Sequence, residues 1–226
     1  MKDLGPLETT LEVTMKDKDL LLTAVTHRSY LNENSNWHLD HHERLEFLGD
    51  AVLELVVTDH LYHHYNMPEG ELTNLRAAIV RGEMLSKIAA EWSLDNFLLL
   101  SRGEKKDTGK ARQYILANAV EAVIGAVYLD QGYTAAADLI QRSVVSKLED
   151  VIANEDHIDN KSKFQELAQE KFRLTPTYSV LEETGPDHDK HFKVGVYVGK
   201  KPMGEGSGSS KQEAQQAAAK DALAQL

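Results

Sequence analysis

Residues 41–59 read His-His-Glu-Arg-Leu-Glu-Phe-Leu-Gly-Asp-Ala-Val-Leu-Glu-Leu-Val-Val-Thr-Asp. At about 100° per residue of an α-helix, the acidic side chains of this stretch fall within roughly 80° of one another. They are Glu43, Glu46, Asp50 and Glu54. The opposite face is apolar and carries Leu45, Leu48, Val52, Leu55 and Val56. The pattern predicts a helix that is apolar nearly all round except for one acidic stripe, and such a helix is expected to be buried.

Two interpretations of the acidic stripe are open. Buried carboxylates are costly unless a positive charge neutralises them, and grouped carboxylate oxygens suit Mg²⁺ or Mn²⁺. The simpler interpretation is an acidic face in contact with solvent on a surface helix.

A second apolar helix is predicted over residues 113–129, with two polar groups in its middle, Asn118 and Glu121. These groups are three residues apart and share a face, and Glu46 and Asp50 lie one turn apart on the first helix. Two such helices packed face to face would surround a divalent cation with oxygen ligands. A cation held this way can make hydroxide from water and neutralise a phosphate in a transition state.

Histidines next to the acidic stripe suggest a zinc site, but the match is incomplete. His42-Glu-Arg-Leu-Glu46 lacks the second histidine of the zinc-protease pattern. Solvent-exposed or hydrogen-bonded histidines at helix ends are the favoured interpretation.

Composition limits the classes of protein to consider. The chain has 226 residues, 42% of them hydrophobic and 27% charged, which is ordinary for a soluble protein. It has no cysteine, which excludes disulfides and is compatible with the cytoplasm. We see no signal peptide and no apolar run near the roughly 18 residues of a transmembrane helix, so no membrane partner is expected. The net charge of −11 falls entirely in residues 1–158, since residues 159–226 hold 10 basic and 10 acidic residues. The second part can therefore contact phosphates.

The hydrophobic period changes along the chain. Helical spacing over residues 17–30, 72–92 and 134–152 predicts that residues 1–153 form an all-α domain. Residues 154–160 are polar and form a predicted linker. Residues 161–226 then predict the order α-β-β-β-α, a small α+β domain whose strands cover residues 177–183, 192–198 and 201–208.

The segment His42-Glu-Arg-Leu-Glu-Phe-Leu-Gly-Asp50 resembles the signature stretch of the ribonuclease III family. Three further blocks resemble the family in the same order: Thr26-His-Arg-Ser-Tyr30, Glu69-Gly-Glu-Leu-Thr-Asn-Leu-Arg76 and Glu121-Ala-Val-Ile-Gly-Ala-Val-Tyr-Leu-Asp130. The C-terminal part is similar to a double-stranded-RNA-binding domain. The resemblance covers nearly the whole chain except the first dozen residues and the linker.

This resemblance implies a function. Family members are homodimeric, Mg²⁺-dependent endonucleases that cut double-stranded RNA and leave 5′-phosphate and 3′-hydroxyl ends with short 3′ overhangs. Mn²⁺ is a possible substitute for Mg²⁺. Processing of ribosomal, messenger and transfer RNA in the cytoplasm is implied as well. The main alternative is a non-catalytic double-stranded-RNA-binding protein that keeps an impaired nuclease domain as a scaffold. A metal hydrolase acting on small phosphate esters would not need the RNA-binding domain.

The resemblance also assigns roles to residues of the nuclease domain. The matching metal ligands are Glu46, Asp50, Asn118 and Glu121, and the matching catalytic pair is Asp50 and Glu121. Glu43 and Glu69 match positions that line an acidic cleft near the dimer interface. The family most often has Asp at position 118. Asn118 keeps a carbonyl oxygen but removes one negative charge, so Mg²⁺ is expected to bind less tightly.

In the second domain, the positions that match RNA contacts are Gln165, Glu166, His188, Ser209, Ser210 and Lys211. The last three precede or begin a helix whose N-terminus favours phosphate. Family members usually have two or three basic residues in a row here, but Gln212 follows Lys211. We therefore predict weaker and less salt-dependent binding than in a fully basic version. Turn and helix-capping residues are the alternative interpretation.

Overall fold

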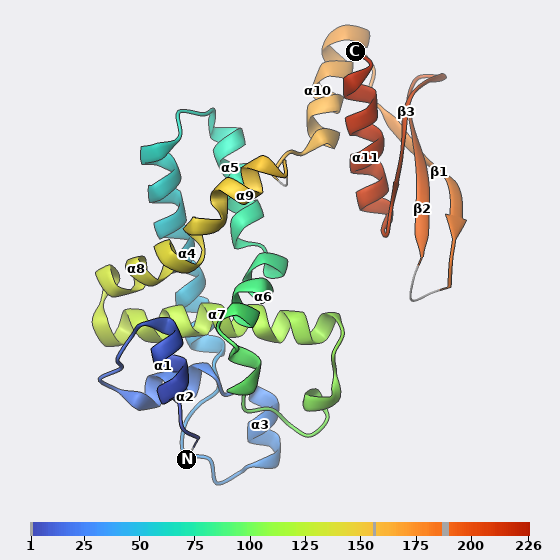
Figure 1. The fold of residues 1–226 in the computed structure, drawn as a ribbon. Helices are drawn as coiled ribbons and strands as arrows, with labels where there is room; N and C mark the ends of the chain where they lie inside the picture. The colour runs from blue at the N-terminus through green and yellow to red at the C-terminus, as the bar shows by residue number, and fades with distance from the viewer. Residues whose placement is uncertain (1, 156, 187–189) are drawn as a thin grey trace. The chain divides into compact units, whose positions relative to one another are not determined.

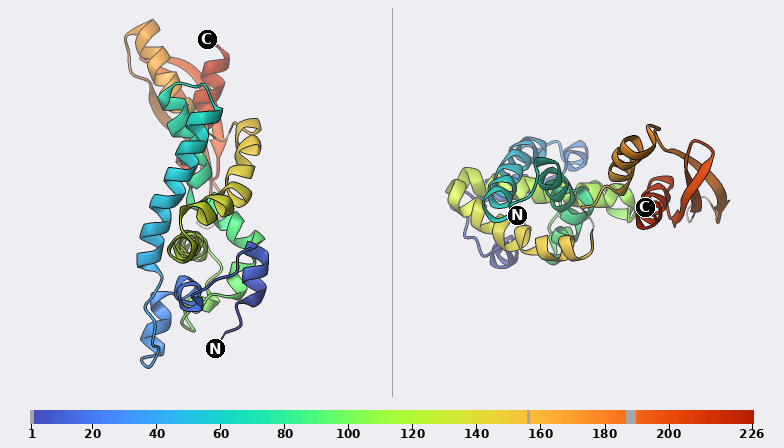
Figure 2. Two further views of the ribbon diagram at one scale, coloured as in Figure 1. Left: turned by 90° about the vertical axis from the view of Figure 1, so that its left-hand side faces the viewer. Right: turned by 90° about the horizontal axis from the view of Figure 1, so that it is seen from above.

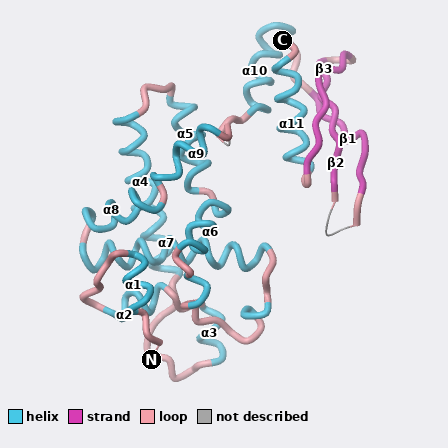
Figure 3. Tube along the Cα trace, viewed as in Figure 1, coloured by secondary structure: helices cyan, strands magenta, loops and turns pink. Residues whose placement is uncertain are grey.

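Two separate hydrophobic cores organise the chain, and the computed structural model divides into two corresponding units, Met1–His157 and Ile158–Leu226 (Figure 1). The structure describes residues 2–155, 157–186 and 190–226. Within these ranges, strands occur only in the second unit (Figure 3). The predicted order, an all-α domain followed by a small α+β domain, is confirmed.

The first unit is built from helices joined by loops and short 3-10 turns. Its helices are α1 Gly5–Leu11, α2 Lys18–Ala24, α3 Arg28–Glu33, α4 Glu43–His64, α5 Glu69–Val80, α6 Gly82–Glu91, α7 Lys110–Gln131, α8 Tyr133–Ser143 and α9 Leu148–Ala153. The 3-10 turns are η1 Leu94–Asn96, η2 Glu104–Lys106 and η3 Val145–Lys147. None of the helices in the described ranges combines the length and apolarity needed to cross a lipid bilayer.

Helix α7 is the centre of the first core. Its middle, residues 119–127, is buried except for Glu121, and most of these residues are alanine, valine or glycine. Helices α2, α4, α6 and α8 pack against it, and α7 runs across α4 in Figures 1 and 2. Small side chains allow this number of neighbours to approach one helix closely.

The crossing of α4 and α7 depends on two glycines. A Cβ atom on Gly49 would lie 1.7 Å from the carbonyl oxygen of Glu121, and one on Gly125 would lie 2.2 Å from the carbonyl oxygen of Leu45. No side chain fits at either position without moving a helix. The two backbones are therefore in direct contact beside Glu121.

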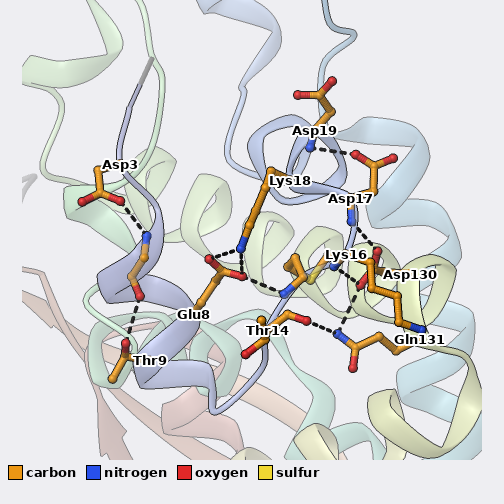
Figure 4. A network of polar contacts seen from close by, with 12 residues as sticks. Asp3, Glu8, Thr9, Thr14, Lys16, Asp17, Lys18, Asp19, Asp130 and Gln131 are labelled. Carbon is orange, nitrogen blue, oxygen red and sulfur yellow. Dashed lines mark hydrogen bonds and ion pairs between the residues drawn. The ribbon is translucent and has the colours of Figure 1, made fainter.

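Helix α1 was not predicted, and the segment after it is attached to the far end of α7 (Figure 4). The carboxylate of Asp130 accepts hydrogen bonds from the backbone N–H groups of Lys16 (2.9 Å) and Asp17 (2.8 Å). Glu8 of α1 forms an ion pair with Lys18, the first residue of α2. These contacts place α2 against α7.

Two predicted helices are interrupted. Residues 17–30 divide into α2 and α3 because Thr26 forms an isolated β-bridge with Leu99. Residues 72–92 divide into α5 and α6 at Arg81, whose backbone is extended with φ −61° and ψ 148°. The bridge at Thr26 is a tertiary contact, which the hydrophobic period does not record.

The second unit is a three-stranded antiparallel sheet covered by two helices. Its elements are α10 Asn160–Phe172, β1 Thr177–Thr184, β2 His191–Val198, β3 Lys201–Gly208 and α11 Lys211–Ala224, with strand order β1-β2-β3. The core joins Phe164 of α10, Val196 of β2 and the alanines of α11. A Cβ on Gly206 of β3 would lie 2.1 Å from the backbone nitrogen of Ala218, which explains the small residues on both elements.

Candidate active site

The α4–α7 crossing brings the predicted carboxylates together. Glu46 and Asp50 flank Gly49 on α4, and Gly49 touches the backbone of Glu121 on α7. Asn118 lies one turn before Glu121 on the same helix. Glu46, Asn118 and Glu121 are half-buried, whereas Asp50 is exposed. The close backbone contact therefore positions two pairs of polar side chains beside each other.

The three carboxylates interact electrostatically. Burial raises the pKa of Glu121 to about 7, and the charges of Asp50 and Glu46 contribute to the rise. Burial also raises the pKa of Glu46, with contributions from Glu43 and Asp50, while a hydrogen bond with the Asn118 side chain opposes the rise. A site with this much mutual repulsion favours binding either a proton or a cation.

The chemical type of the oxygen atoms in this cluster suits a divalent cation. They are hard carboxylate and amide oxygens, and the buried Oε2 atom of Glu46 has no hydrogen-bond partner among the described residues. In the described part of the chain, no three His, Asp or Glu side chains converge closely enough to enclose a metal ion. Mg²⁺ usually keeps several waters and needs only one or two direct carboxylates, so the residues fit a water-bridged Mg²⁺ or Mn²⁺.

The acidic stripe predicted from the sequence is only partly present in the site. Glu54 is exposed, and its position lies beyond the crossing with α7. Glu43 begins α4 and forms an ion pair with Arg28 at 3.2 Å. Glu69 begins α5 and is exposed. Glu69 lines a pocket with Thr58 and Tyr62 near the C-terminal end of α4, so Glu43 and Glu69 lie near opposite ends of one helix.

An apolar stripe on α4 contradicts the prediction that this helix is buried nearly all round. Phe47 is 81% exposed, Leu55 57% and Tyr62 75%, and the three residues share one face of the helix. Leu55 was expected on the buried face, but no other helix of the described structure covers it. Next to Phe47 lies an open cavity of about 670 Å³ whose lining includes Leu20 and Leu129. We call Phe47, Leu55 and Tyr62 the exposed α4 stripe.

His42, which the sequence suggested only as part of an incomplete zinc-protease pattern, is buried at the start of α4. His42 is 2% exposed, and its backbone N–H donates to the carbonyl oxygen of Thr26 at 2.9 Å. Burial lowers the pKa of His42 to about 4, and the neighbouring His27 and His41 contribute to the decrease. The ring is therefore neutral at physiological pH.

The predicted RNA-contacting residues of the second unit gather at the N-termini of α10 and α11. Gln165 and Glu166 are exposed on α10, and Gln165 lines a polar groove together with Lys211. Ser209 Oγ donates to Glu213 Oε2 at 2.6 Å, and Ser210 Oγ accepts from the Glu213 N–H at 3.2 Å. Both serines therefore have capping roles in the free protein.

Two further positions complete the predicted RNA-binding set. The Lys211 ammonium lies 5.5 Å from the ring centroid of Phe192 and is presented on the first turn of α11. The prediction for His188 falls outside the described residues.

Comparison with known proteins extends over both units. Residues 17–148 match the ribonuclease-III-like family, and residues 160–226 match the double-stranded RNA binding motif. Ribonuclease 3 of Dehalococcoides mccartyi is 43% identical over 227 residues, which covers all of this chain and 96% of that protein. Ribonuclease 3 of Oceanobacillus iheyensis is 45% identical over 222 residues, with coverage of 98% and 97%.

A solved structure is similar to the first unit. The nuclease domain of ribonuclease III from Campylobacter jejuni superposes with a TM-score of 0.56 at 40% identity, covering 62% of this chain and 98% of that one. It was described for structural flexibility in a region involved in dimer formation.

Proposed function

Because the chain belongs to the ribonuclease III family and carries a double-stranded-RNA-binding domain, we propose that it is an endoribonuclease that hydrolyses double-stranded RNA with a divalent cation. The observation that supports this most directly is the cluster of Glu46, Asp50 and Glu121 at the α4–α7 crossing. Burial and the charges of the other two carboxylates raise the pKa of Glu121 to about 7. A scaffold without activity would gain nothing from this repulsion. The products would be 5′-phosphate and 3′-hydroxyl ends with short 3′ overhangs.

The residues of the site have distinct roles in this proposal. Glu46, Asn118 and Glu121 would hold Mg²⁺ or Mn²⁺, with Asp50 bound directly or through water. The cation, when bound, supplies a hydroxide nucleophile and neutralises charge on the phosphate. Asp50 is the exposed member, so it can orient a water molecule toward an incoming phosphodiester. The backbone contact at Gly49 keeps Asp50 next to Glu121.

The proposed active form is a homodimer in which two chains complete each cleft. Glu43 is the first residue of α4, and Glu69 lines a pocket with Thr58 and Tyr62, which lie roughly 22–29 Å further along that helix. A cleft lined by both carboxylates therefore needs two chains. The exposed α4 stripe offers the apolar surface for this association, because large exposed apolar patches mark interfaces. Phe47 next to the cavity lined by Leu20 and Leu129 provides a projecting side chain and a recess on the same surface.

The second unit would bind the duplex through shape, 2′-hydroxyls and phosphates. Gln165 and Glu166 on α10 would face a minor groove, and Lys211 with the N-terminus of α11 would face phosphates. Ser209 and Ser210 would add to this contact, as would His188. We propose that the substrates are precursors of ribosomal RNA, with some messenger and transfer RNAs, in the cytoplasm.

The decisive experiment is cleavage of a long RNA duplex by the full chain with Mg²⁺, with and without EDTA, beside a single-stranded RNA. We expect duplex-specific, EDTA-sensitive cutting to 5′-phosphate ends. Glu121→Gln should abolish cutting and keep duplex binding, whereas Glu54→Gln should cut normally because Glu54 is an exposed acid on the same helix. Binding without cutting by the unaltered chain would favour the non-catalytic alternative, unless Asn118→Asp restores activity.

The homodimer has its own test. Phe47→Asp should shift the protein from dimer to monomer in sedimentation velocity, because it places a charge in the apolar stripe. Tyr133→Asp is the matched control, since Tyr133 is 43% exposed on α8 and lies outside the stripe. A monomeric unaltered protein, or a dimeric Phe47→Asp variant, would contradict the proposed interface.

A further inference from the structure

His42 and Thr26 are the buried polar side chains of the described structure, and they lie side by side at the start of α4. Thr26 is fully paired: its Oγ1 donates to the Leu22 carbonyl oxygen at 2.7 Å, and its own carbonyl accepts from the His42 N–H. The ring of His42 differs, because its buried Nδ1 atom has no hydrogen-bond partner among the described residues. Buried ring nitrogens usually have a hydrogen-bond partner, so the role of this ring depends on what its other nitrogen, Nε2, contacts.

The other ring nitrogen faces the proposed active site. Nε2 of His42 lies 3.6 Å from Oε2 of Glu46, one helical turn further along α4. That carboxylate oxygen is also buried and also without a hydrogen-bond partner in the described part of the chain. Two buried polar atoms therefore face each other, slightly beyond the 2.7–3.2 Å of an N–H···O bond.

The tautomer follows from this arrangement. A neutral imidazole carries one N–H donor and one acceptor nitrogen. With the hydrogen on Nε2, the donor faces a carboxylate oxygen and only an acceptor is left unpaired. With the hydrogen on Nδ1, a buried donor would be unpaired and two lone pairs would face each other, which is the costlier state. We assign the hydrogen to Nε2.

We propose that His42 is a positioning residue of the hydrolytic site, whose Nε2–H donates to Oε2 of Glu46 and turns the other carboxylate oxygen toward Asn118 and Glu121. This inference rests on the proposed function. Closing the 3.6 Å separation to about 2.9 Å requires a carboxylate movement of only about 0.7 Å. When a hydrogen bond orients a metal-binding side chain, its loss typically lowers metal affinity by about 10–100-fold.

The competing explanation is that His42 simply fills space at the start of α4. The two explanations predict different metal affinities for variants that keep the volume of the side chain but change its hydrogen-bonding groups. His42→Leu fills the space but removes the donor, whereas His42→Gln keeps a side-chain N–H that can reach Glu46. Space filling predicts that both variants bind metal alike, and positioning predicts that only His42→Gln keeps the affinity.

The experiment measures Mn²⁺ binding to the full chain without RNA, by calorimetry or electron paramagnetic resonance, together with kcat and KM on a duplex. We expect His42→Leu to bind Mn²⁺ about 10-fold or more weakly, with a lower kcat and an unchanged KM. His42→Gln should stay within about threefold of the unaltered protein. His60→Leu is the control, because His60 is a half-buried histidine near the other end of α4.

Equal Mn²⁺ affinity in His42→Leu and the unaltered protein would overturn the inference, and so would equal losses in the Leu and Gln variants. Circular dichroism checks that each variant is folded, and His42→Met replaces the Leu variant if the latter is not. Failure of the proposed function looks different, because the unaltered protein itself would then neither bind Mn²⁺ nor cut duplex RNA.

Discussion

Gly49→Ala is the substitution that most directly tests how the site is assembled. The added Cβ would lie 1.7 Å from the carbonyl oxygen of Glu121, where a close carbon–oxygen contact is about 3.3 Å. The Cβ atom would therefore be about 1.6 Å too close to the oxygen. The atoms that clash with it belong to the backbone of α7, so no flexible side chain can move aside. Helices α4 and α7 would have to separate or rotate.

The expected magnitude follows from overpacking. Forcing extra atoms into a packed core costs typically about 1–3 kcal/mol and sometimes more, and this contact lies at the severe end. For a domain of this size, about 3 kcal/mol corresponds to a decrease in Tm of roughly 6–12 °C. The same movement draws Asp50 away from Glu121, so duplex cleavage should fall by at least about tenfold even where the variant is fully folded.

The assay combines thermal unfolding by circular dichroism with cleavage of a duplex at 20 °C. Gly82→Ala is the matched control, because a Cβ at Gly82 would make an ordinary contact of 3.8 Å with the Cβ of Ala117. Gly82→Ala should change Tm by no more than a few degrees and keep full activity. A Gly49→Ala protein with unaltered Tm and cleavage rate would refute the argument that the glycine contact builds the site.

Three further predictions follow from the structure. The folded-state pKa of Glu121 is about 7 and lies above its ordinary value of 4.5, so the metal-free protein should lose stability as the pH rises from about 4.5 to 7. Glu121→Gln should remove this loss and be the more stable protein at pH 8 in chemical denaturation. Equal pH profiles of the two proteins would contradict this prediction. Asp130→Asn should weaken the bonds to the N–H groups of Lys16 and Asp17, lower stability by about 1–2 kcal/mol and speed hydrogen exchange at both amides, measured by mass spectrometry. Gln212→Lys should make duplex binding steeper in salt by about one unit of the logarithmic slope, measured by filter binding, and identical slopes would remove the idea that Gln212 weakens phosphate contact.

Local patterns of apolar residues were enough to predict an all-α first domain and an α+β second domain. The helical spacing in 41–59 and the alternation in 192–198 each identified the type of element. The alternation also identified the buried face of its strand, whereas the helical spacing did not show that one apolar face of α4 is exposed. The same reasoning could not find the break at Thr26, because it depends on a bridge to Leu99, far away in the sequence. It also missed the break at Arg81, where apolar spacing continues across an extended residue. Helix α1 was missed because seven residues carry too little periodicity.

The candidate site shows a similar division. Spacing alone placed Glu46 and Asp50 on one face and Asn118 and Glu121 on another, but it could not show that the two faces meet. The signal that was available is the pair of glycines, Gly49 and Gly125, within otherwise apolar helices. Exposure of Phe47, Leu55 and Tyr62 was not predictable, because a single sequence does not distinguish an apolar face that packs inside the chain from one left for another chain.

The attachment of residues 16 and 17 to Asp130 bears on how the protein is made. These hydrogen bonds join positions 114 and 113 residues apart in the sequence, so the first helices cannot be fixed in place until α7 has been synthesised. At about 5–20 residues per second, that delay is roughly 6–23 s. During it, the buried faces of α2 and α4 have no α7 to cover them. A nascent chain halted near residue 120 should therefore be cut readily by protease in its first 60 residues, whereas a chain halted after the whole first unit has left the ribosome should resist.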